Sequence, residues 1–227
     1  MKIGIIVAMD KELARLRELL DGAHEERHGC VDFIVGNVGG KEVVLQKCGI
    51  GKVNSAVGAV EMLDNYRPDV VVSSGVAGGA CSCMKVCDMV VGTEYRYHDA
   101  YCGDECAFGQ IAGMPEAYTT PKELVDKARA AGGGTAVYYG LIVSGDWFVD
   151  TQNKMRAILS RFPETAAVDM ESCSIAQVCH AYGVPFVSFR VISDIPLSDH
   201  KASQYYNFWD NLADGAFETT KRFIEML

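Results

Sequence analysis

The sequence has little positive charge and no long apolar run. Its 21 Lys and Arg residues are outnumbered by 30 Asp and Glu residues, which gives a formal net charge of −9 at pH 7. Non-specific nucleic-acid binding depends on basic surface, so this balance argues against a nucleic-acid partner. No apolar run reaches the roughly 20 residues that a membrane-spanning helix needs. We therefore expect a cytoplasmic protein, without a membrane association, that takes a small neutral or zwitterionic substrate.

Two glycine-rich segments lack the signatures of phosphate-binding loops. "GVAGGA" (75–80) has neither the Gly-Lys-Ser/Thr ending of a P-loop nor the G-x-G-x-x-G pattern. "GIGKVN" (49–54) comes nearer to the dinucleotide pattern, but Asn54 replaces the third Gly. We interpret the second segment as a strand-to-helix turn.

The cysteines fit a metal site poorly. There are nine of them, an odd number, and Cys81, Cys83 and Cys87 are spaced C-x-C-x₃-C. Zinc sites usually show paired C-x₂₋₄-C knuckles. The first residues (1–13) predict a buried strand followed by acids, not a signal peptide. We therefore expect reduced, free thiols and no metal.

The chain is long and apolar enough for one sizeable core. It has 227 residues, of which 49% are hydrophobic, and no linker-like, repeated or low-complexity segment. Apolar, β-branched runs alternate with segments of helical spacing, which predicts an α/β domain spanning 1–227. We expect strands at 2–8, 68–80, 87–97, 136–145, 166–170 and 184–193, a hairpin at 31–49, helices at 10–22, 51–66, 121–132, 151–162, 171–183 and 203–227, and a loop at 98–120.

Acidic residues follow three of the predicted strands. Glu12 comes after the first strand, Glu171 after 166–170 and Asp194 after 184–193. Ligands of open α/β sheets bind at the carboxyl ends of strands, so these side chains could share one edge with the "GVAGG" loop. Each also has a structural interpretation: Glu12 as a solvated acid in a first helical turn, and Asp194 as a turn cap.

Three carboxylates without a metal cluster or a Cys/His pair suggest acid–base chemistry. Cleavage of an N-glycosidic bond needs such a set, because one acid protonates the leaving base, one base activates water and one acceptor holds the sugar hydroxyls. Carboxylates also stabilise the cationic sugar that forms on the way. The sequence thus favours a nucleoside as the small-molecule substrate.

Seven segments together resemble the 5′-methylthioadenosine/S-adenosylhomocysteine nucleosidases of the nucleoside phosphorylase superfamily. They are "KIGIIVAMDKEL", "GIGKVNSA", "SSGVAGGA", "YHDA", "GLIVSGDWFV", "VDMES" and "VPFVSFRVISD". Their order and spacing match over nearly the whole chain. The resemblance implies a three-layer α/β/α fold around a mixed, mostly parallel sheet, a homodimer, no cofactor, and irreversible hydrolysis of the bond between adenine and ribose.

The resemblance also implies a role for individual residues. Glu12 matches the general base for water, and Asp194 the acid that protonates N7 of adenine with help from Ser193. Glu171 matches the acceptor of the ribose 2′ and 3′ hydroxyls, and Arg190 a partner of the water and of Glu171. The remaining implied substrate contacts are Phe148, which stacks on adenine, Val149, which reads the base edge through its backbone, and the walls Met9, Ile50, Val76, Gly78 and Met170.

Three positions depart from the family pattern or carry no assigned role. Many members have Ser at the position of Val76. A Ser hydroxyl can join a polar network, whereas the Val side chain cannot. The stretch 101–114 is shorter than usual and contains cysteines, which changes the pocket for the 5′ substituent; Tyr205 could contribute there. Asp169 receives no role.

Two other classes of function stay open. One is a nucleoside phosphorylase or another superfamily hydrolase, such as one that acts on futalosine. A phosphorylase must hold phosphate with Arg or clustered amides, for which Arg96 and Arg190 remain candidates. The other is a non-catalytic nucleoside-binding module, which would need neither a proton donor nor a base for water.

Overall fold

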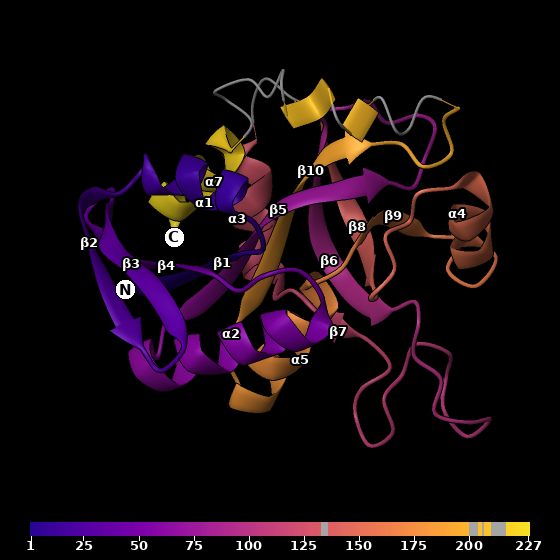
Figure 1. Cartoon of the computed structure of the whole chain (residues 1–227), viewed down its shortest axis with the longest axis horizontal. Helices are drawn as coiled ribbons and strands as arrows, with labels where there is room; N and C mark the ends of the chain where they lie inside the picture. Colours follow the sequence, from indigo (N-terminus) through magenta and orange to yellow (C-terminus); the bar gives the residue numbers. More distant parts are fainter. Residues whose placement is uncertain (133–135, 200–203, 206, 210–216) are drawn as a thin grey trace.

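The computed structural model describes residues 1–132, 136–199, 204–205, 207–209 and 217–227. A ten-stranded mixed sheet lies at the centre, and helices cover both of its faces (Figure 1). This arrangement confirms the predicted three-layer α/β/α fold. The strands are β1 (Lys2–Val7), β2 (Asp21–His28), β3 (Val31–Val38), β4 (Lys41–Lys47), β5 (Val70–Gly79), β6 (Met89–Tyr97), β7 (Tyr118–Thr119), β8 (Val137–Ser144), β9 (Thr165–Asp169) and β10 (Phe186–Asp194).

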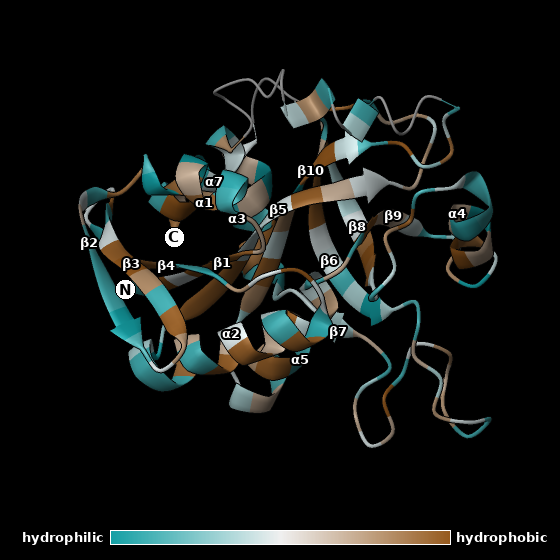
Figure 2. Cartoon of the chain, in the orientation of Figure 1, coloured by the Kyte–Doolittle hydropathy of each residue, from teal (hydrophilic) through white to brown (hydrophobic). Residues whose placement is uncertain are grey.

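The helices form two layers because each buries one apolar stripe against the sheet. They are α1 (Asp10–Arg17), α2 (Lys52–Tyr66), α3 (Lys122–Ala131), α4 (Gln152–Leu159), α5 (Ser172–Tyr182) and α7 (Glu218–Met226). Helices α1, α3 and α7 share one core cluster with the strands, and α2 and α5 share the cluster on the other face. Figure 2 shows the apolar residues gathered on the strands and on the helix sides that face them.

The sheet is more evenly mixed than the sequence predicted. Strand β1 lies parallel to β4 and β5, and β5 lies parallel to β10. However, β6 joins β10 and β9 joins β5 in antiparallel pairs, and the β2–β3–β4 meander is antiparallel too. Because β5 pairs with β1, β9 and β10, it brings the ends of these three strands together.

The predicted helix at 10–22 is wrong in its second half. Helix α1 spans Asp10–Arg17 with Met9 as its N-cap, and β2 begins at Asp21. Strand β2 is an edge strand of polar sequence, held by its backbone pairing with β3. Because mostly polar side chains line both of its faces, it carries no apolar alternation that a sequence could reveal.

Two further predictions need correction. The segment 98–120, predicted to be a loop throughout, contains the short strand β7, which pairs with β6. Cys81 and Cys83, expected as free thiols, are joined by a disulfide, and the other seven cysteines are free. Of the predicted helix at 203–227, α7 is confirmed, while 203, 206 and 210–216 lie outside the described residues. No helix in the described ranges is long and apolar enough to cross a membrane.

Candidate active site

A cleft opens where the ends of β1, β5, β9 and β10 meet the loop after β8. It holds about 620 Å³ of free space, part of it open to solvent. The position follows from the topology, because β5 collects the neighbouring strand ends at one edge. The residues that line it are Ala8, Met9, Glu12, Ile50, Val76, Ala77, Gly78, Trp147, Phe148, Val149, Val168, Asp169, Met170, Glu171, Ser193, Asp194 and Tyr205.

All but one of the predicted site residues line this cleft. The exception is Arg190, which lines a smaller adjoining space of about 200 Å³. Glu12 and Glu171 line both spaces and therefore lie between them. The three carboxylates that the sequence singled out, which come from distant parts of the chain, thus meet at one place.

Glu12 is held by backbone amides at the start of α1. It lies in the first helical turn, and its Oε2 accepts hydrogen bonds from the N–H groups of Ala8 (2.9 Å) and Met9 (3.0 Å). Its Oε1 accepts a third from the N–H of Val76 at 3.0 Å. The side chain is therefore buried rather than solvated, and the interpretation of Glu12 as an exposed first-turn acid is wrong. A side chain at Gly75 would lie only 2.7 Å from this carboxylate, so glycine is needed there.

Burial raises the pKa of Glu12 above its usual value, although Arg190 and the three amides act in the opposite direction. A carboxyl group with a raised pKa is a better proton acceptor once ionised. The fixed amides keep its oxygens in one orientation. The geometry therefore suits a base that acts on a molecule in the adjoining space.

The two acids before α5 have different partners. Asp169 accepts hydrogen bonds from the N–H of Ser172 through both carboxylate oxygens, at 3.3 and 3.1 Å, and its Oδ2 also accepts one from the Ser172 hydroxyl. Asp169 thus caps the first turn of α5, a task usually performed by the N-cap side chain. Glu171, which occupies the N-cap position, makes no such bond. Its carboxylate is left to face the cleft.

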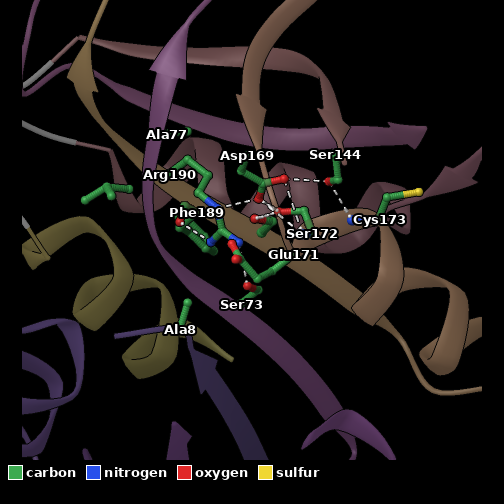
Figure 3. A network of polar contacts seen from close by, with 12 residues as sticks. Ala8, Ser73, Ala77, Ser144, Asp169, Glu171, Ser172, Cys173, Phe189 and Arg190 are labelled. Carbon is green, nitrogen blue, oxygen red and sulfur yellow. Dashed lines mark hydrogen bonds and ion pairs between the residues drawn. The ribbon is translucent and has the colours of Figure 1, made fainter. Parts of the chain in front are cut away.

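Asp169 is also the centre of a buried polar network (Figure 3). Arg190 Nε donates to its Oδ2 at 2.7 Å, and Ser144 Oγ donates to its Oδ1 at 2.5 Å. The guanidinium also donates to Ser73 Oγ and to the carbonyl of Phe189. The side chains of Asp169 and Arg190 are 1% and 3% exposed, so this ion pair is deeply buried and well hydrogen-bonded.

Sequence reasoning missed this function of Asp169. A signal was present, since an Asp three residues before Ser172 at a strand-to-helix junction is a capping pattern. Arg190, in turn, was expected to contact Glu171. Its hydrogen bonds go to Asp169, Ser73 and Phe189, and it acts on Glu171 through its charge.

Glu171 has few compensating contacts. Its Oε1 accepts a hydrogen bond from the N–H of Gly51 at 2.9 Å. Burial, with a smaller contribution from the nearby charge of Asp169, raises its pKa to about 8, against the opposing effect of Arg190. Near neutral pH the free side chain therefore readily holds a proton. Hydroxyl donors placed against it would favour its charged form.

The smaller space is polar and lies beside both glutamates. Arg190, Ser73, Ser74 and Cys48 line it together with Glu12 and Glu171. Burial and the two glutamates raise the pKa of the Cys48 thiol to about 12, so this cysteine stays protonated and is a poor nucleophile. The space is better suited to water than to a covalent intermediate.

The end of β10 and the loop after β8 form the remaining walls. Ser193 Oγ donates a hydrogen bond to Asp194 Oδ1 at 2.7 Å, and both residues are buried. The ring of Phe148 lies 5.4 Å from that of Tyr205, and both residues line the cleft. Phe148 is half exposed, as is Trp147, which also lines the cleft. The cleft thus has an acidic end and an aromatic mouth.

The fold and this site match known proteins. The sequence profile of the phosphorylase superfamily matches residues 2–225. A 5′-methylthioadenosine/S-adenosylhomocysteine nucleosidase of Haemophilus influenzae (strain PittEE) is 40% identical over 100% of this chain and 99% of its own. The chain belongs to the 5′-methylthioadenosine/S-adenosylhomocysteine nucleosidase family.

Solved structures agree with this membership. The nucleosidase from Neisseria meningitidis in complex with methylthio-immucillin-A has a TM-score of 0.93, 33% identity and coverage of 100% of this chain and 99% of that one. The futalosine hydrolase of Helicobacter pylori has a TM-score of 0.91 at 28% identity, with coverage of 100% and 98%. The nucleosidase family thus shares its architecture with a hydrolase named for a different substrate.

Proposed function

We propose that the chain hydrolyses the N-glycosidic bond of 5′-methylthioadenosine, S-adenosylhomocysteine or both, releasing adenine and the thioribose product. The observation that carries this proposal is the placement of two buried glutamates with raised pKa values between an open cleft and a small polar space. A nucleoside fits the cleft, and a water molecule fits the polar space beside its sugar.

Each chemical task of this hydrolysis has a matching side chain. Glu12, ionised, removes a proton from the water that attacks the anomeric carbon. Asp194, oriented by Ser193, donates a proton to N7 of the departing adenine. Glu171 accepts the two ribose hydroxyls, and its charge stabilises the cationic sugar. Arg190 holds Asp169 and adds positive charge beside the water.

The substrate's other parts meet apolar walls. Phe148 stacks on adenine, and the backbone of Val149 reads its edge. Met9, Ile50, Met170, Val76 and Gly78 surround the sugar and the base. Tyr205, at the cleft mouth beside Phe148, faces the 5′ substituent.

The acid role of Asp194 can be tested by an isosteric change. Asp194→Asn keeps the shape of the side chain but cannot donate a carboxyl proton, so turnover is expected to fall at least about 100-fold. Binding of a non-hydrolysable adenosine analogue, measured by calorimetry, should change much less. Turnover at the wild-type rate would remove Asp194 from the mechanism.

A phosphorylase is the main alternative, and the charges of the site oppose it. Phosphate needs Arg side chains or clustered amides. Among the described residues that line the two spaces, Arg190 is the single Lys or Arg, and its hydrogen bonds are already directed to Asp169 and Ser73. Two glutamates face the position that phosphate would take. Water is the better nucleophile for this arrangement.

One assay separates the alternatives. Adenine release is measured in phosphate-free buffer with methylthioadenosine, S-adenosylhomocysteine, deoxyadenosine, inosine and futalosine. We expect release from the thio-substituted adenosines that does not change when phosphate is added. Release that requires phosphate would indicate a phosphorylase. A preference for futalosine would indicate a futalosine hydrolase. Binding without release over hours would indicate a non-catalytic module.

The proposal includes a homodimer in the cytoplasm. Val53 and Val57 on the outer side of α2 are 74% and 46% exposed, and Tyr101 in the segment after β6 is exposed too. An apolar surface of this kind suits an interface with a second copy. Light scattering is expected to give a dimer mass, and cell fractionation to recover the protein with cytosolic enzymes. A monomer at micromolar concentration would contradict the first expectation.

A further inference from the structure

Three loops at the edge of the cleft are tied together by one ionic cluster. Lys52 Nζ lies 2.8 Å from both carboxylate oxygens of Asp99, which follows β6. Asp99 Oδ2 also accepts a hydrogen bond from the N–H of Asp146, in the loop after β8, at 2.8 Å. Asp146 Oδ1 in turn accepts one from the N–H of Lys52 at 2.8 Å. The three residues therefore close a ring of contacts between segments far apart in the sequence.

The cluster is built into the fold rather than lying loosely on the surface. The side chain of Asp99 is 8% exposed and that of Lys52 28%, and the Lys52 ammonium also lies 5.4 Å from the Tyr97 ring centroid. Two glycines make room for it. A side chain at Gly51, whose φ is +95°, would lie 2.9 Å from Asp146 Oδ1, and one at Gly145 would lie 2.7 Å from the Asp99 carboxyl carbon.

The residues next to the cluster are those that line the cleft. Ile50 and Gly51 directly precede Lys52, and the Gly51 N–H is the hydrogen-bond donor to Glu171. Phe148 follows Asp146 by two residues on the other side of the cleft. The cluster thus connects two segments that both contribute residues to the cleft.

We propose that Lys52 and Asp99 are positioning residues for hydrolysis: their ion pair holds the Ile50–Gly51 turn and the Phe148 loop at the separation that a bound nucleoside requires. The inference rests on the proposed function. Neither side chain touches the cleft, so both act through their neighbours. Displacement of catalytic groups by about 1 Å can reduce a rate by about 100-fold, which sets the scale of the expected effect.

The test compares Lys52→Met, Asp99→Asn and Lys52→Arg with the wild type in steady-state adenine release. For Lys52→Met we expect kcat to fall and KM to rise, each by about tenfold, because both the alignment and the binding of the sugar suffer. For Asp99→Asn we likewise expect kcat to fall and KM to rise. Lys52→Arg can still pair with Asp99 and is expected to restore kcat/KM to within about threefold of the wild type.

Lys2→Met is the matched control. Lys2 forms a 2.9 Å ion pair with Glu42 and lies 5.8 Å from the Tyr66 ring centroid, so it resembles Lys52 in its contacts, but it is at the opposite end of β1 from the cleft. We expect the Lys2→Met variant to be as active as the wild type. Melting temperatures and circular dichroism report how much of each variant is folded.

The proposal is overturned if kcat/KM per folded molecule stays within threefold of the wild type in both Lys52→Met and Asp99→Asn. It is also overturned if Lys52→Arg is as impaired as Lys52→Met. A failure of the proposed function would look different, because the wild type itself would then release no adenine from any of the thio-substituted nucleosides.

Discussion

Asp169 and Glu171 are separated by one residue, yet their carboxylates lie in opposite surroundings. Asp169 faces a guanidinium, two hydroxyls and a helix N–H, all at hydrogen-bonding distance. Glu171 and its neighbour Glu12 are also buried, but the hydrogen bonds found for them come from backbone amides, and their pKa values are raised. The first environment stabilises a charge, whereas the second makes a charge costly.

The two kinds of surroundings indicate two roles for buried acids, one in folding and one in catalysis. The paired acid holds β9, β10 and the start of α5 in register, so it should matter for folding. In the proposed reaction the two glutamates with raised pKa values gain further partners from substrate and water, so they should matter for turnover and reduce the stability of the free protein. Substitutions at the two kinds of acid are therefore expected to act in opposite ways.

The largest effect is expected for Glu12→Gln. The amide cannot take a proton from water, so kcat should fall by about 1,000-fold or more. KM for methylthioadenosine should change only a few-fold, because Glu12 is not proposed to grip the sugar. Glu18→Gln, an exposed change directly after the same helix, is the control and should be fully active. A kcat within tenfold of the wild type would mean that the base lies elsewhere.

Asp169→Asn should reduce stability rather than act on the chemistry alone. It removes the hydrogen-bonded counter-charge of the buried Arg190, which costs about 3 kcal/mol in the free energy of unfolding. This corresponds to a melting temperature lower by on the order of 10 °C. Urea unfolding and calorimetry measure both quantities.

The matched control is Asp32→Asn. Asp32 pairs with Arg27 at 2.8 Å, but both side chains are more than 60% exposed. Because solvent screens such a pair, its loss should change stability by less than about 1 kcal/mol. If the two substitutions destabilised the protein equally, the Asp169–Arg190 pair would not have the structural role that its burial indicates.

The sequence predicted the buried parts of this fold well because burial leaves a periodic signal. Runs such as 2–8 and 184–193 are apolar along their whole length, which is typical of strands covered on both faces, and they are β1 and β10 in the structure. The edge strand β2 left no such signal. Its pairing partner, β3, supplies the order that its own side chains do not.

The site was predictable in its acids but not in their partners. Glu12, Glu171 and Asp194 each follow a predicted strand, and a shared sheet edge follows from that position alone. The assignment of Asp169 to Arg190, or of Lys52 to Asp99, depends on which strands are neighbours. The members of the second pair are 47 residues apart, and local sequence has no means of showing that they meet.

The last of the expected effects concerns the stability of Glu171→Gln as a function of pH. In the wild type, the folded pKa of about 8 lies above the usual 4.5, so the folded protein holds a proton that the unfolded chain releases. Its free energy of unfolding should therefore decrease as the pH rises from 5 to 9. The amide cannot ionise, so Glu171→Gln lacks this decrease.

The two curves should consequently diverge with rising pH, with Glu171→Gln gaining roughly 4 kcal/mol over the wild type between pH 5 and pH 9. Its turnover should nevertheless fall, since the neutral amide stabilises the cationic sugar less well. Glu164→Gln, at an exposed position before β9, should follow the wild-type curve throughout. Parallel curves for Glu171→Gln would show that Glu171 is already well compensated in the free protein, like Asp169, and the contrast between the two acids would then disappear.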